Sequence, residues 1–350
     1  MIRNEMKAAL LKASREIEVV EVEKPVPKQN EVLIKVKSCG ICGTDLHAYT
    51  SKLEDSWYTL PQVPGHEFSG EVVSKGEVVT KVSVGDRVTV RPLISCGRCY
   101  FCKSGDEYRC DAFQIVGETL PGALAEYIVA PEHFVHVLPS ELSFTEGAMV
   151  EPLSVALHAA SKARKRDSVA IIGAGTIGLL IMQAIRALGA KKIVVSDILD
   201  SRLNLATKLG ADHIFRTTDE DYVTQVKEVT EGLGADATFE VVGKPQTLDL
   251  SLKSTRKGGE ICVVGVFEKA SLPFNIMDVQ NFEFTVYGTF GFTVVEWNNA
   301  IDLIRMKKVN VDKLVTHKLS LAETKAGFEL MSNPPKDHLV LKTHILPSTD

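Results

Sequence analysis

Two groups of metal-ligating side chains occur in the first third of the chain. Four cysteines fall within fifteen residues in the pattern CxxCxxCx7C, at Cys96, Cys99, Cys102 and Cys110. Each ligand of a tetrahedral zinc must lie about 2.3 Å from the ion, so this tight spacing predicts a closed, structural zinc site. A disulfide knot is the alternative. Such scaffolds are usually short, however, whereas this chain has 350 residues and an odd number of cysteines, seven.

The second group combines one thiol, one imidazole and a carboxylate, at Cys42, His66 and Glu67. A mixed set of this kind is typical of a catalytic zinc, which keeps one coordination position open for water or substrate. The two groups differ in composition. We therefore expect two zinc sites with different roles.

A glycine-rich motif, GAGTIG, follows an expected strand at 168–172 and precedes an apolar helix that runs to Leu188. The first glycine of such a GxGxxG motif permits a tight turn, the second lets the backbone approach a pyrophosphate, and the third lets the helix pack on the strand. The diphosphate then lies at the helix N-terminus. The residues expected to bind the dinucleotide here are Gly173, Gly175, Thr176, Ile177 and Gly178.

An acidic residue supports the dinucleotide interpretation. Asp197 ends the next expected strand, nineteen residues after Gly178, where a carboxylate can bind the ribose 2′-hydroxyl. The same carboxylate repels a 2′-phosphate, which favours NAD over NADP. Arg202 follows on the next helix, where it either softens that preference or is a solvated charge on the helix surface.

Several residues of reactive type fall outside these motifs. Cys39 and Cys262 lie in apolar, strand-like segments, so we expect them to be core residues. His158 lies at the start of an apolar helix and is also expected in the core. His133 and His136 follow Pro131 in an expected loop, which favours the protein surface.

The composition excludes several classes of protein. Forty basic and forty-five acidic side chains give a net charge of −5, so there is no basic footprint for nucleic acid. No segment has the pattern of a signal peptide or approaches the roughly 18 apolar residues of a membrane span. We expect a cytoplasmic protein that acts on small molecules.

The elements that must position these residues change character near residue 151. Before it, short strands at 31–37, 68–73, 87–90 and 123–129 predict an antiparallel β domain. After it, buried strands alternate with helices, which predicts a doubly wound parallel sheet whose sixth strand spans 284–290. A helix near 297–306 and a strand in HLVLKTHIL then return to the first domain. The expected domains are 1–151, 152–288 and 289–350, with a cleft between the β domain and the sheet domain.

Together with the four cysteines, the segments CGICGTDLH (39–47), GHEFSGEV (65–72), EPLSVALHA (151–159) and GAGTIG (173–178) resemble the zinc-dependent medium-chain dehydrogenases. The resemblance covers essentially the whole chain. The glutamate of MVEPLSV is similar to the polyol (sorbitol-type) and threonine dehydrogenase branches. The resemblance implies an α/β protein in which a GroES-like β domain carries both zinc sites and a doubly wound Rossmann domain is inserted. It also implies a homo-oligomer, either a dimer or a tetramer.

Carried over to this sequence, the family pattern makes Cys42 and His66 ligands of the catalytic zinc. Glu67 and Glu151 are each able to ligate the zinc or to hold its water, and the sequence does not decide between them. Thr44 matches the position whose hydroxyl meets the substrate oxygen. His47 matches the relay that exports the proton.

The substrate segment departs from the sorbitol-type pattern. Gly291 and Phe292 stand where those enzymes typically place an arginine and a tyrosine. Without that charged anchor, we expect selectivity to depend on shape and on the zinc, with Trp57 and Tyr58 as candidates for the pocket wall.

The implied activity is hydride transfer between the secondary alcohol of a polyol or sugar alcohol and NAD. L-threonine and butanediol are the alternative substrates. A zinc-independent reductase and a non-catalytic nucleotide-binding protein are competing classes. Neither would need Cys42, His66 and Glu151 together, so the intact ligand set argues against both.

Overall fold

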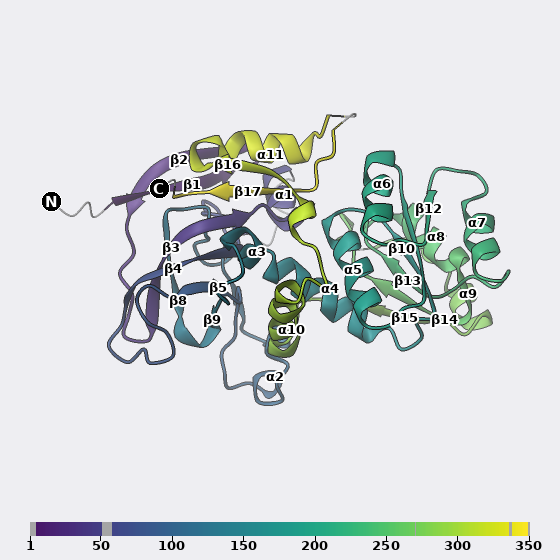
Figure 1. Cartoon of the computed structure of the whole chain (residues 1–350), viewed down its shortest axis with the longest axis horizontal. Helices are drawn as coiled ribbons and strands as arrows, with labels where there is room; N and C mark the ends of the chain where they lie inside the picture. The colour runs from purple at the N-terminus through teal and green to yellow at the C-terminus, as the bar shows by residue number, and fades with distance from the viewer. Residues whose placement is uncertain (1–4, 51–57, 270, 336–337, 349–350) are drawn as a thin grey trace. The chain divides into compact units, whose positions relative to one another are not determined.

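The computed structural model describes residues 5–50, 58–269, 271–335 and 338–348. The chain folds into two compact units, whose elements are labelled along the chain in Figure 1. The first unit consists of Met1–Glu151, Thr293–Lys307 and Val311–Asp350, and the second of Pro152–Phe292 and Lys308–Asn310. The first unit therefore contains both cysteine-bearing groups, and the second contains the glycine motif.

A seven-stranded sheet forms the frame of the first unit. Its path runs β16 (Val315–Ser320), β17 (Lys342–Leu346), β3 (Glu31–Gly40), β4 (Glu67–Lys75), β5 (Arg87–Val90) and β9 (Val135–Val137), and β8 (Tyr127–Pro131) also pairs with β3. All pairs are antiparallel except β16 with β17. A separate hairpin joins β1 (Glu5–Ala13) to β2 (Glu16–Glu23). The predicted antiparallel β domain is confirmed.

Strand β8 begins four residues later than the sequence predicts. The backbone N–H groups of residues 122–124 instead donate to the carbonyls of residues 63–65, at 2.7 to 3.0 Å. Ala125 makes an isolated bridge to Ala8. Residues 123–129 therefore pair with three segments, namely residues 63–65, Ala8 and strand β3, which a single alternating pattern does not reveal.

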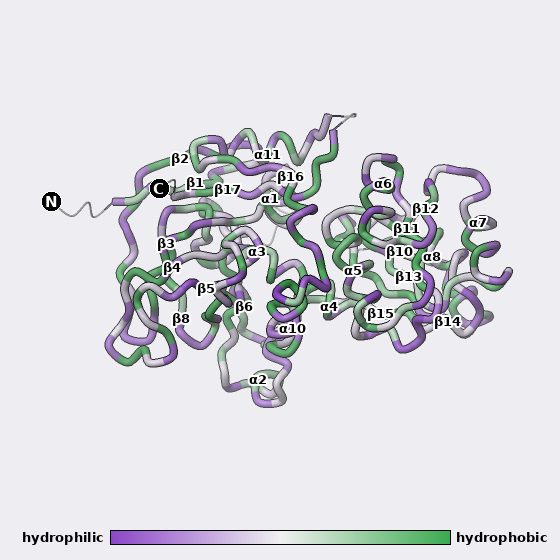
Figure 2. The backbone as a smooth tube through the Cα atoms, in the orientation of Figure 1, coloured by the Kyte–Doolittle hydropathy of each residue, from purple (hydrophilic) through white to green (hydrophobic). Residues whose placement is uncertain are grey.

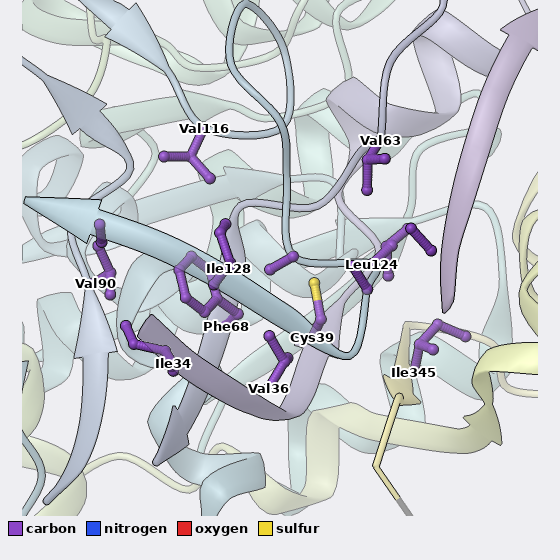
Figure 3. Close-up of a cluster of buried hydrophobic side chains, with 14 of the residues drawn as sticks. Ile34, Val36, Cys39, Val63, Phe68, Val90, Val116, Leu124, Ile128 and Ile345 are labelled. Atoms are coloured by element: carbon purple, nitrogen blue, oxygen red, sulfur yellow. The ribbon is translucent and has the colours of Figure 1, made fainter. Parts of the chain in front are cut away.

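Apolar side chains from several strands meet on one side of this sheet (Figure 3). Ile34 and Val36 of β3 and Phe68 of β4 are at most 1% exposed. Val63 and Leu124, from the two hydrogen-bonded loop segments, belong to the same cluster. Cys39 lies among them and is fully buried, as predicted.

Short helices connect and cover this frame. They are α1 (Gly43–Thr50), α2 (Tyr100–Lys103), η2 (Glu107–Arg109), η3 (Glu132–Phe134), α3 (Phe144–Ala148), α10 (Val294–Arg305), η4 (Asp312–Leu314), η5 (Leu321–Glu323) and α11 (Thr324–Ser332). Helix α10, expected near 297–306, begins at a capping box in which Thr293 and Glu296 satisfy each other's backbone N–H groups. Two short strands, β6 (Leu93–Ile94) and β7 (Gln114–Ile115), pair at the base of the four-cysteine lobe.

The second unit contains a six-stranded parallel sheet, as predicted. The strand order is β12 (His213–Arg216), β11 (Lys192–Asp197), β10 (Ser168–Ile172), β13 (Ala235–Glu240), β14 (Thr255–Val263) and β15 (Thr285–Gly288). Its helices are α5 (Thr176–Ala187), α6 (Asp200–Lys208), α7 (Tyr222–Val229), α8 (Pro245–Ser254) and α9 (Ile276–Asn281), and α4 (Val150–Lys162) leads into it. The order reverses at β10, and ligands of such sheets bind at the carboxyl end beside that switch point.

Burial explains the unbroken apolar runs of this unit. Residues 169–172 of β10 are fully buried, and β10 and α5 are predominantly green in Figure 2. Cys262, on β14, is 1% exposed and is a core residue, as predicted. No helix of the described chain is long and apolar enough to cross a membrane.

Candidate functional site

The first candidate metal site lies at the end of β3 and the beginning of β4, which are adjacent strands of the first unit's sheet. Glu67 begins β4 and pairs directly with Gly40 at the end of β3, so His66 and Cys42 lie just beyond this pair. One ligand atom of each of Cys42, His66 and Glu67 lies within 4.8 Å of the others. His66 is 5% exposed and Glu67 is fully buried. The antiparallel register therefore brings Cys42 to two ligands that are 24 and 25 residues away in sequence.

The chemistry of this donor set fits a divalent metal. Burial raises the pKa of the Cys42 thiol, so a thiolate is costly there without a nearby cation. His66 Nδ1 and Glu67 Oε2 are buried and receive no hydrogen bond in the described chain. Sulfur, nitrogen and carboxylate donors with unused acceptor capacity match a catalytic zinc with an open position.

A buried lysine holds the other oxygen of Glu67. Lys342 Nζ lies 2.7 Å from Glu67 Oε1 and also donates to the carbonyl of Ile41 at 3.1 Å. Burial opposes the lysine's charge, but Glu67 and Cys42 outweigh it, and the pKa of Lys342 is raised. The sequence prediction missed this residue. A lysine within the apolar segment VLKTHIL was the signal that could have found it.

Glu151 lies near this site but outside the close group. It occupies the first turn of α4 and is 8% exposed. Burial raises its pKa to about 7, with His66 lowering it and Glu67 raising it further. The structure thus places Glu67 with Cys42 and His66, and leaves Glu151 as a buried carboxyl in electrostatic contact with them.

Helix α1 carries the expected substrate-side residues. Thr44 Oγ1 lies 3.7 Å from Cys42 Sγ, and His47 is half-buried one turn later. Asp45 is fully buried and accepts hydrogen bonds from the Cys42 N–H at 2.8 Å and the Tyr58 hydroxyl at 2.5 Å. Tyr58 is therefore buried against Asp45. Trp57, the other candidate for the pocket wall, lies outside the described residues.

The four-cysteine lobe converges as its spacing predicts. A tetrahedral site with bonds of about 2.3 Å requires sulfurs about 3.8 Å apart. The Cys96–Cys102 and Cys99–Cys102 sulfurs are 3.9 and 3.5 Å apart, and all four ligand atoms lie within 4.8 Å of one another. No disulfide joins any of the seven cysteines, all of which are described. Backbone N–H groups of Arg98 and Cys99 lower the pKa of Cys96 to about 6, which favours the thiolate.

An ionic network anchors this lobe to the sheet. Arg91, which is 5% exposed, donates to Glu107 at 2.7 Å and to His136 Nε2 at 3.1 Å. His133 is exposed, as predicted, and lies 3.1 Å from Glu107. His136 is half-buried and lies in strand β9 rather than in the expected loop. Its ring lies 5.7 Å from that of Trp297, and burial and Arg91 lower its pKa to about 4.

The glycine motif of the second unit has the geometry that a dinucleotide requires. Gly173 has a φ of +107°, which favours glycine, and a Cβ on Gly178 would lie 1.8 Å from the Gly173 carbonyl oxygen. Space at Gly175 is open, and α5 begins at Thr176. The first amides of α5, including that of Ile177, lack partners within the helix and are suited to a phosphate.

Asp197 is tied to this motif. It ends β11, is 6% exposed, and accepts a hydrogen bond from the Ala174 N–H at 2.8 Å. Its other oxygen accepts the N–H groups of Ile198 and Leu199. Arg202 NH1 lies 3.6 Å from Asp197, so the arginine is partly neutralised by this carboxylate.

Comparison with known proteins identifies the family. The model of the alcohol dehydrogenase GroES-like domain matches residues 28–140, and that of the zinc-binding dehydrogenases matches residues 176–306. The chain is 36% identical to sorbitol dehydrogenase of Bacillus subtilis (strain 168) over 328 residues, 93% of each chain. It is 37% identical to L-threonine 3-dehydrogenase of Pyrococcus furiosus, covering 94% of this chain and 96% of that one.

A solved structure shares the same fold. The crystal structure of 2R,3R-butanediol dehydrogenase from Bacillus subtilis superposes with a TM-score of 0.88 at 34% identity, covering 98% of this chain and 100% of that one. The chain therefore belongs to the zinc-dependent medium-chain dehydrogenase family. It combines a GroES-like domain with a Rossmann domain, in a family of oxidoreductases that use zinc and NAD or NADP.

Proposed function

We propose that this chain is a zinc-dependent oxidoreductase that transfers a hydride between the secondary alcohol of a polyol or sugar alcohol and NAD. The observation that carries the proposal is the convergence of the half-buried Cys42 with the buried His66 and Glu67, with which Glu151 interacts electrostatically. A bound zinc lowers the pKa of a coordinated hydroxyl, and a bound nicotinamide accepts the hydride.

The chain's own residues orient the alcohol and move its proton. Thr44 and His47 lie three positions apart on α1 and so share one face of the helix. In our proposal the Thr44 hydroxyl accepts the substrate proton as it donates its own towards His47, which releases it to solvent. Asp45 positions this segment, because it accepts the Cys42 N–H and the Tyr58 hydroxyl.

The preference for NAD rests on Asp197. Its carboxylate lies beside the glycine motif, where it would bind a ribose hydroxyl and repel a 2′-phosphate. The ion pair with Arg202 supports this preference, because a paired arginine attracts a phosphate less strongly than a free one. The cofactor-binding residues in this proposal are Gly173, Gly175, Thr176, Ile177, Gly178, Asp197 and Arg202.

L-threonine or a butanediol is the second candidate substrate. The identity to L-threonine 3-dehydrogenase over 94% of the chain supports the amino alcohol. The similarity to a butanediol dehydrogenase structure supports the diol. All of these compounds carry a secondary alcohol, so they share the same zinc chemistry.

A metal assay combined with a substrate panel tests the proposal. We expect about two zinc ions per chain and reduction of NAD, in preference to NADP, by at least one polyol, threonine or butanediol. A zinc-independent reductase would instead reduce quinones or enones, and would still do so after treatment with a chelator. A nucleotide-binding scaffold would bind NAD and turn over none of the panel.

We also propose a homo-oligomer, a dimer or a tetramer, in the cytoplasm. Strand β15 is an edge strand, and edge strands carry unpaired backbone groups that can join another chain. Beside it in the sequence, Ile276 and Met277 of α9 are 65% and 57% exposed. Reduced cysteines suit a reducing compartment. Light scattering of the purified protein tests the oligomer.

A further inference from the structure

One buried carboxyl group near the candidate catalytic site has no role in the mechanism above. Glu118 is only 5% exposed. No residue of the described chain donates a hydrogen bond to its carboxylate, although its backbone carbonyl accepts the Thr59 N–H and the Gln62 amide, each at 3.3 Å. Neither oxygen is among the fully buried side-chain atoms that lack a partner, so the carboxylate remains accessible to a donor. A ligand that supplies a donor would form a charge-assisted hydrogen bond there.

The loop that carries Glu118 is fixed against the segment that ends in His66. Gly117 packs so closely on Gly65 that a Cβ at Gly117 would lie 2.8 Å from backbone atoms of Gly65. Directly after the loop, the N–H groups of residues 122–124 donate to the carbonyls of residues 63–65. The position of Glu118 relative to His66 is therefore set by backbone packing.

The charged groups that interact with Glu118 belong to the candidate catalytic site. Burial raises the pKa of Glu118, while His66 lowers it and Asp45 raises it. Glu118 in turn contributes to the raised pKa values of Tyr58 and Glu151. Glu118 thus interacts with the proposed zinc ligand His66, with Glu151, and with the hydrogen-bonded pair Asp45 and Tyr58.

We propose that Glu118 is a specificity-determining residue that accepts a hydrogen bond from a second donor of the substrate, a hydroxyl or an ammonium group near the reacting alcohol. This inference rests on the proposed function. It gives the first unit a charged acceptor, whereas Gly291 and Phe292 replace the charged anchor of the sorbitol-type pattern with uncharged residues. The Glu118 carboxylate would repel a phosphate placed at the position of this second donor, so a phosphorylated polyol is disfavoured.

The test compares substrates that differ by one donor. We expect the wild-type enzyme to oxidise at least one of 2,3-butanediol and 3-amino-2-butanol with a kcat/KM about tenfold or more above that for 2-butanol. A factor of this size corresponds to one hydrogen bond to a charged group. The more favoured of the two identifies the donor. We also expect a polyol to be oxidised at least about tenfold more efficiently than its phosphate ester.

Two variants locate the effect. In Glu118→Ala the preference for the second donor should fall by about tenfold or more, and Glu118→Gln, which keeps a neutral acceptor, should lie between the two. Thr119→Val is the matched control. It removes the hydrogen bond from the Ile115 N–H to the Thr119 hydroxyl within the same loop, 2.8 Å long, and leaves Glu118 unchanged. Its preference should equal that of the wild type.

Each outcome decides between the two proposals. If the wild type oxidises 2-butanol as efficiently as both two-donor substrates, or if Glu118→Ala keeps the wild-type preference, Glu118 is no anchor and the proposed function stands. The wild-type comparison decides even where a variant fails to fold. If the wild type oxidises no alcohol with NAD or NADP, the proposed function is refuted and this inference with it.

Discussion

Replacing Lys342 with methionine should destabilise the protein strongly, because it leaves a buried charge without its partner. The side chains of Lys342 and Glu67 are 4% and 1% exposed, and Nζ lies 2.7 Å from Oε1. Methionine keeps most of the side-chain length but cannot neutralise the carboxylate. Removing one member of a buried ion pair typically costs about 3 to 5 kcal/mol of the free energy of unfolding.

This loss should depend on the metal. A zinc ion bound by Glu67 supplies positive charge at the same carboxylate, so Lys342→Met should cost less in the zinc-loaded protein than after chelation. The double variant Lys342→Met/Glu67→Gln should recover most of the loss, since replacing both members of such a pair is often nearly neutral. Urea unfolding at pH 7, with and without chelator, measures each free energy.

The pH dependence has a definite sign. Burial lowers the pKa of Lys342, but Glu67 and Cys42 raise it more, so the folded pKa lies above the unfolded one. The contribution of the lysine is therefore complete below about pH 10.4 and is lost as the pH rises through the folded pKa. At pH 7 the ion pair contributes in full.

A half-buried lysine provides the matched control. Lys192 donates to the carbonyl of Val229 at 2.6 Å, and its replacement by methionine should cost about 1 kcal/mol. The reasoning is refuted if Lys342→Met costs no more than this control in the metal-free protein. It is also refuted if the double variant is as unstable as the single one, because the unpaired carboxylate would then not be the cause.

Four further predictions concern the two metal sites, the cofactor and the buried side of His136. Cys42→Ser and His66→Ala should abolish alcohol oxidation and leave the melting temperature nearly unchanged; turnover above a few per cent of wild type would contradict this. Cys99→Ser should lower the melting temperature and the zinc content, because it opens a closed site, and normal melting with lost activity would reassign the lobe. Asp197→Ser should lower the ratio of kcat/KM for NAD to kcat/KM for NADP, which corresponds to a loss of about 1.5 to 3 kcal/mol in the preference for NAD. An unchanged ratio would show that Asp197 does not select the cofactor. Because the folded pKa of His136 is depressed to about 4, its contribution to stability is complete above about pH 6.5 and is lost as the pH falls to about 4. The free energy of unfolding of His136→Gln should therefore fall less than that of the wild type over this interval, and parallel curves would show that the ring does not titrate as described.

The boundaries of the elements show where sequence patterns suffice. Strands 87–90 and 168–172 were predicted to the residue, because each is a short apolar or alternating run between turn residues. Strand β8 was placed too early because residues 122–124 bind residues 63–65 rather than β3. Nothing in the local pattern distinguishes these two partners.

The sequence by itself determined the sites whose residues are neighbours in the chain. The four cysteines converge within one lobe, and the turn at Gly173 requires glycine whatever surrounds it. Such features depend on local backbone geometry, which spacing encodes directly.

Only the tertiary structure decided which groups, distant in sequence, form ion pairs or hydrogen bonds with one another. Glu67, rather than Glu151, joins Cys42 and His66 because β3 and β4 pair with Gly40 opposite Glu67. Lys342 reaches that carboxylate from 275 residues away. These ion pairs are strong because they are buried. Their burial results from packing between segments that are distant in sequence, so it cannot be predicted from any one segment.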